Sequence, residues 1–89
     1  METAHFSVTL GFMPDYAYQG KGVRVDAIIE GRNAEKIGMK GGDVITQLGD
    51  YAVSDIYSYM EALGKFKKGE ATTVTVLRGN ETLTLNVVF

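Results

Sequence analysis

Residues 22–45 read GVRVDAIIEGRNAEKIGMKGGDVI, and the periodicity of this stretch decides the fold class. In its first half an apolar residue recurs at every second position, which is the period of two expected of a half-buried β-strand. The alternation sets Val23, Val25, Ala27 and Ile29 against Arg24, Asp26, Ile28 and Glu30. The stretch therefore begins with a strand.

A short helix and a second strand follow in the same stretch. Residues 33–37 allow one or two helical turns, with Asn33 able to cap the start and Gly38 free to take the left-handed conformation at the end. Gly-Gly-Asp at 41–43 is typical of a turn, and residues 44–48 predict a strand.

Upstream of this stretch, residues 6–12 are rich in β-branched and aromatic side chains and predict another strand. Pro14 and Asp15 then interrupt the pattern, because proline has no N–H to give to a sheet. Gly20-Lys21-Gly22 indicates the loop that leads into the central stretch.

Downstream, Gly49-Asp50 predicts a type II′ reversal, with residues 51–53 as the return strand. An amphipathic helix is expected next, because Ser54 is suited to cap it and apolar residues recur at i, i+3, i+4 and i+7. Its end is expected near Gly64. The apolar positions are Ile56, Tyr59, Met60 and Leu63.

The last third predicts a hairpin, with strands over 72–78 and 82–89 joined at Gly79-Asn80. Elements of this length and order favour an α+β fold, mainly β: a small, partly open antiparallel barrel or sandwich capped by two helices. Because 89 residues support one modest core, residues 1–89 are expected to be a single domain. Residues 1–7 are interpreted as a flexible or added N-terminal lead.

The composition argues against several classes of partner. A formal net charge of -2, with acids and bases interleaved, offers no electrostatic footprint for nucleic acid or anionic lipid. No stretch approaches the roughly 18 apolar residues of a membrane span. We therefore expect neither nucleic acid nor membrane as partner, while the absence of cysteine leaves the compartment open.

The sequence offers no catalytic site. The single histidine, His5, lies near the terminus, so a triad of nucleophile, base and acid is not expected. Metal-ligand and nucleotide-binding spacings are also missing, which predicts no metal site and no cofactor. Leu10-Gly11-Phe12 is different, because a glycine between two large apolar residues could present bare N–H groups to a carboxylate or could equally be a plain strand kink.

Taken together, these motifs resemble those of PDZ domains. Thr9-Leu10-Gly11-Phe12 is similar to their Gly-Leu-Gly-Phe carboxylate-binding loop, and residues 22–45 are similar to their central strand, helix and Gly-Asp-x-Ile stretch. The resemblance runs from about Val8 to the C-terminus. It is strongest to the PDZ domains of bacterial proteases, both trypsin-like proteases and zinc aminopeptidases, and residues 10–16 resemble the aminopeptidase group more.

The resemblance implies a peptide-binding site. The backbone N–H groups of Leu10, Gly11 and Phe12 would hold a C-terminal carboxylate, and an extended peptide would lie between the strand at Phe12 and the helix at Ile56. Phe12 and Leu63 would line the pocket for the last side chain. The implied site residues are Leu10, Gly11, Phe12, Met13, Ile56, Met60 and Leu63.

Two positions depart from the family pattern, and one assignment has an alternative. Pro14 stands where the family offers an N–H to the ligand, which weakens binding or suits an internal segment. Asn33 stands where bacterial relatives often have proline. Ile56 and Met60 could instead be core residues.

The function expected is that of a non-catalytic module that binds an apolar C-terminal segment by β-augmentation. Its parent would be a larger bacterial peptidase, and the compartment would be periplasmic or extracellular if that parent is exported. The alternative is a structural appendage that docks on or positions a neighbouring metallopeptidase domain in the same polypeptide without binding free peptide.

Overall fold

The computed structural model describes residues 8–89, so the predictions for residues 1–7, including His5 and the start of a strand at Phe6, lie outside it. Strands and helices follow one another in the order predicted. They are β1 Phe12–Pro14, β2 Val23–Ile28, α1 Asn33–Lys36, β3 Val44–Leu48, β4 Tyr51–Ala52, α2 Ile56–Leu63, β5 Ala71–Arg78 and β6 Glu81–Val88.

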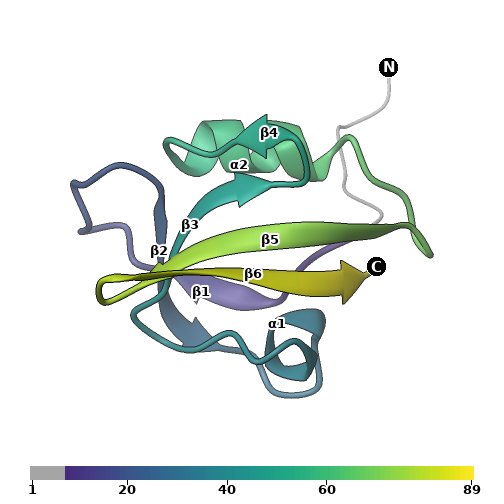
Figure 1. Ribbon diagram of the computed structural model, residues 1–89, viewed down its shortest axis with the longest axis horizontal. Coiled ribbons are helices and arrows are strands. Elements are labelled where there is room, and N and C mark those ends of the chain that lie inside the picture. Colours follow the sequence, from purple (N-terminus) through teal and green to yellow (C-terminus); the bar gives the residue numbers. More distant parts are fainter. Residues whose placement is uncertain (1–7) are drawn as a thin grey trace.

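The strands form one open antiparallel sheet. Its order is β1-β2-β3-β5-β6, and β4 pairs with β3 beside this path. In Figure 1, α2 lies beside β3 and β4 on one side of the molecule and α1 lies near β1 on the opposite side. In the described part of the chain, β1 and β6 are the two ends of this path, and β4 is a further edge strand that pairs with β3 alone. This arrangement confirms the α+β, mainly β architecture.

The core lies between the curled sheet and the helices. The period of two in β2 and β5 turns alternate side chains inward, and α2 contributes one face. The largest side chains with almost no exposed surface are Leu10, Ile45, Leu48, Val25, Val74, Val76, Val87 and Asp43.

Asp43 is the buried charge in this set, and it joins a turn to the end of β5. It accepts hydrogen bonds from the Lys40 N–H (2.9 Å) and from Arg78 Nε (2.9 Å) and Nη2 (2.8 Å). Burial alone would raise the pKa of Asp43, but these hydrogen bonds and the charges of Arg78 and Lys40 outweigh it, so the pKa lies below its ordinary value.

The first strand is displaced from its predicted position. We expected a strand over 6–12 broken by Pro14, whereas residues 8–11 are not a strand and β1 begins at Phe12 and includes Pro14. The backbone of Gly11 has φ +81°, which ends the extended conformation before Phe12. Pro14 is tolerated because its nitrogen faces the sheet edge, where no ladder bond is lost.

Both predicted helix N-caps were wrong by one residue, whereas Gly38 has the left-handed φ of +85° expected after the first helix. Arg32 is the N-cap of α1 without a side-chain bond, and Asn33 instead donates from Nδ2 to the Thr9 carbonyl at 3.1 Å. Asp55, not Ser54, caps α2 and exchanges hydrogen bonds with Ser58. The Gly49 reversal does have the positive φ of +60° that a II′ turn requires.

Candidate functional site

The loop before β1 is shaped by close contact with the start of α1. The Leu10 side chain is fully buried, and its carbonyl accepts a 2.6 Å hydrogen bond from the Ala34 N–H. Gly11 has φ +81°, and a Cβ at this position would overlap with Cβ and Cγ of Arg32. Only glycine fits here, because both the backbone conformation and the space exclude a side chain.

One of the main-chain donors in this loop has a partner within the domain. The Gly11 N–H donates to Thr9 Oγ1 at 3.2 Å. A side-chain oxygen thus lies where a ligand carboxylate was expected to accept the same bond.

The pairing of β1 with β2 fixes which main-chain groups of β1 face the open edge. Hydrogen bonds run from the Ile29 N–H to the Gly11 carbonyl (3.1 Å) and from the Asp15 N–H to the Arg24 carbonyl (2.9 Å). Since successive residues of a strand point their main-chain groups to opposite sides, Phe12 and Pro14 present theirs to the open edge.

The register shift in this pair does not disturb that alternation. Met13 lies opposite Ala27 and Pro14 opposite Val25, so the extra residue, Asp26, belongs to β2. The open edge of β1 therefore offers the N–H and carbonyl of Phe12 and the carbonyl of Pro14. Pro14 has no N–H to offer.

The helix α2 supplies the second side of the site. Its capping box fixes the first turn, and its residues Tyr59, Ala62 and Leu63 are buried. Ile56 is half-buried and packs against the core, so both a core role and a site role fit its position.

Tyr59 is the side chain of α2 that reaches β1. Its ring meets the Phe12 ring edge to face, with centroids 5.4 Å apart and an interplanar angle of 67°, and only 6% of Tyr59 is exposed. Burial raises the pKa of Tyr59 strongly, with the backbone of Leu10 acting in the opposite direction. The sequence pattern predicts Tyr59 on the apolar stripe of this helix but gives no signal that it belongs to the site.

The two methionines named from the sequence lie differently. Met13 is 54% exposed, and because it follows Phe12 in a strand its side chain lies on the opposite face of the sheet. Met60 is 42% exposed and flanks Ile56 on the helix surface. The structure thus brings together Leu10, Gly11 and Phe12 with α2, while Met13 points away from that contact.

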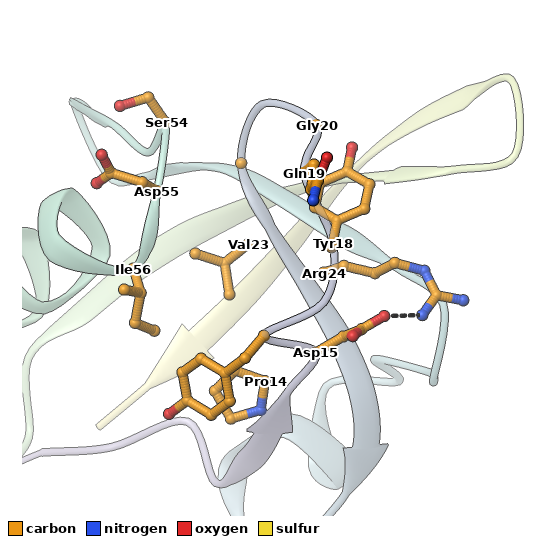
Figure 2. Close-up of a pocket in the computed structure, with 12 residues that line it drawn as sticks. Pro14, Asp15, Tyr18, Gln19, Gly20, Val23, Arg24, Ser54, Asp55 and Ile56 are labelled. Carbon is orange, nitrogen blue, oxygen red and sulfur yellow. Dashed lines mark hydrogen bonds and ion pairs between the residues drawn. The ribbon is translucent and has the colours of Figure 1, made fainter.

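An open pocket of about 280 Å³ lies at the far end of β1, between the β1–β2 connection and the start of α2. Figure 2 shows Val23 and Ile56 facing one another across it and Pro14 below, while the Arg24–Asp15 ion pair (2.7 Å) lies on the outer side. The remaining lining comes from Tyr16, Tyr18, Gln19, Gly20, Gly22, Ser54 and Asp55.

Within residues 8–89, no group of three His, Cys, Asp or Glu side chains is arranged to hold a metal ion. No helix among the described residues is long and apolar enough to cross a membrane.

Comparison with known families agrees with this geometry. A family model for the PDZ domain matches residues 8–88, so the chain belongs to the PDZ domain family. The PDZ domain is a non-catalytic protein-interaction module, and in protease relatives catalysis resides in a separate domain.

The most informative relatives are bacterial proteases. The chain is 40% identical over 79 residues to the serine protease Do-like HtrB of Bacillus subtilis, spanning 88% of this chain and 17% of that protein. In the solved aminopeptidase N family protein from Idiomarina loihiensis, 20% identical, the match has a TM-score of 0.82 and covers 93% of this chain and 14% of the other. The solved structure of the HtrA-type protease AlgW with decapeptide matches with a TM-score of 0.81 at 19% sequence identity. This match covers 93% of this chain and 29% of the AlgW chain.

Proposed function

We propose that this domain binds the C-terminal segment of a peptide or protein as an extended strand added to β1, opposite α2. The open edge of β1 carries the proposal, because Phe12 offers both an N–H and a carbonyl there and Pro14 offers a carbonyl. The solved relative with a decapeptide supports peptide binding by this family.

The terminal carboxylate would be held by the N–H groups of Leu10, Gly11 and Phe12. The Gly11 N–H already donates to an oxygen acceptor, the Thr9 hydroxyl, which supports a carboxylate at this place. A carboxylate is the stronger acceptor, since hydrogen bonds to charged groups contribute about 1.5–3 kcal/mol against about 1 kcal/mol for neutral ones.

Side-chain choice would come from the apolar surface beside the strand. Ile56, Val23 and Pro14 line the open pocket, so an apolar ligand residue upstream of the chain end is favoured there. Burial of one such side chain contributes about 1.5–3 kcal/mol. With one main-chain donor missing at Pro14, a dissociation constant in the micromolar range or weaker is expected.

The parent protein is proposed to be a larger bacterial peptidase that carries this domain as an accessory. The support is that the chain spans only 17% of the serine protease and 14% of the aminopeptidase family protein that it matches.

A second candidate follows from the same coverage together with Pro14. The domain would dock on, or position, a neighbouring metallopeptidase domain in the same polypeptide without binding free peptide. The missing N–H at Pro14 favours this candidate mildly, because a fixed intramolecular contact needs fewer ladder bonds than a free ligand.

A peptide series distinguishes these candidates. Acetylated hexapeptides Gly-Ser-Gly-Val-Val-X, with X as Ala, Val, Leu or Phe, are titrated as free acids and as C-terminal amides. Peptide binding predicts that at least one acid binds and that its amide binds at least about tenfold more weakly, since the charged acceptor is lost. If no acid binds at millimolar concentration, the proposed function is wrong and the docking role is favoured.

A further inference from the structure

The end of the groove next to the carboxylate-binding loop is already filled by the domain itself. The residues assigned from the sequence to the pocket for the last ligand side chain are Phe12 and Leu63. Leu63 is 5% exposed, and the Tyr59 ring packs on Phe12 with centroids 5.4 Å apart. The open pocket of the groove is lined instead by Pro14, Val23 and Ile56, and Phe12, Tyr59 and Leu63 are not part of its lining.

We propose that Tyr59 is a specificity-determining residue that occupies the site of the last ligand side chain, so that the domain selects chain ends with a small last residue, such as alanine. This inference rests on the proposed peptide-binding function. The residue that selects the last ligand side chain would then lie on α2 and pack against β1. Larger apolar side chains of the ligand would bind in the open pocket, upstream of the chain end.

The packing around Tyr59 explains why a ligand would not easily displace it. Its ring is buried against Phe12 and belongs to the same core cluster as Leu10 and Leu63, so turning it out would expose a large apolar surface. A small last residue leaves this packing in place.

Tyr57 provides a matched comparison on the same helix. It has the same side chain two residues earlier, but it is 79% exposed and lies outside the core cluster. Replacing Tyr57 removes an aromatic ring from α2 without opening the space next to Phe12.

The test compares the Ala-ended and Leu-ended peptides of the series above on the unmodified domain and on Tyr59→Ala, Tyr59→Leu and Tyr57→Ala. The unmodified domain and Tyr57→Ala are expected to bind the Ala-ended peptide about tenfold more tightly than the Leu-ended one. Tyr59→Ala is expected to reverse this order, because the leucine side chain fills the space that the ring leaves. Tyr59→Leu, which retains more apolar volume if Tyr59→Ala does not fold, is expected to reduce the preference to less than about threefold.

The outcomes separate this inference from the function on which it rests. If the unmodified domain binds the Leu-ended peptide as tightly as the Ala-ended one, or if Tyr57→Ala changes the preference as Tyr59→Ala does, the role of Tyr59 is wrong while peptide binding stands. If no variant binds either peptide, the proposed function itself fails.

Discussion

Pro14 lies opposite Val25 across the β1–β2 pair, and its main-chain groups face the open edge of the sheet. This arrangement explains why a proline is accepted in a strand that otherwise carries the proposed binding site. The domain keeps its own ladder intact, and a ligand strand added at this edge would lack one hydrogen bond.

Restoring an N–H at this position is expected to strengthen peptide binding. Pro14→Val and Pro14→Ala both add a main-chain N–H but differ in side chain. Both should therefore lower the dissociation constant of the Ala-ended peptide about two- to tenfold. This is the change expected for one net hydrogen bond of about 0.5–1.5 kcal/mol. Isothermal titration calorimetry on the three proteins measures this. Weaker binding by both variants would show that the ligand does not pair with this edge.

The contact between Gly11 and Arg32 predicts a large effect of adding one methyl group. Gly11→Ala should destabilise the domain and abolish peptide binding, because φ is +81° and the new Cβ meets the Arg32 side chain. Gly31→Ala is the matched control, since Gly31 also has φ +81° but nothing lies within 4 Å of its Cβ position.

Urea denaturation of both variants separates the two causes. Gly31→Ala is expected to lose about 1–2 kcal/mol of unfolding free energy from the backbone conformation alone, with peptide binding retained. Gly11→Ala should lose clearly more. Equal losses would contradict the close packing of the loop on α1.

The buried carboxylate of Asp43 predicts an acid-sensitive fold. Its pKa is below the ordinary 3.8 in the folded state, so the stability it contributes is complete above that value and is lost as the pH falls through the lower folded pKa. Thermal unfolding between pH 5 and pH 2 should therefore show a falling midpoint, with a shallower slope in Asp43→Asn.

Removal of the same carboxylate at neutral pH tests its hydrogen bonds. Asp43→Ala leaves the donors of Lys40 and Arg78 without their acceptor and should cost about 1–3 kcal/mol in urea denaturation. Asp50→Ala, at an exposed turn, is the control and should change stability by less than about 0.5 kcal/mol. A similar loss in both variants would contradict a structural role for Asp43.

Local patterns predicted most of the elements. The strand over 44–48 and the helix with its apolar positions from Ile56 to Leu63 were predicted within a residue, because period and turn chemistry act over a few neighbouring residues. The Gly-Leu-Gly-Phe resemblance likewise led to a family that the comparison confirms.

The features that the sequence did not predict depend on contacts between distant segments. Tyr59 and Met60 are adjacent on one apolar stripe, and the rotation of α2 against β1 decides which of them meets Phe12. The start of β1 depends in the same way on the approach of Arg32 to Gly11, which lies 21 positions earlier in the chain. Neither contact leaves a periodic signal.

A chain end is proposed to add to β1, and the sheet offers β6 as a second edge for comparison. An ¹⁵N–¹H correlation spectrum recorded while the Ala-ended free acid is added measures both edges at once. Addition of the chain end to β1 predicts that the amides of Leu10, Gly11 and Phe12 and those of α2 shift with peptide, while the amides of Thr84 and Asn86 in β6 do not shift. Shifts confined to β6, or none at millimolar peptide, would contradict it.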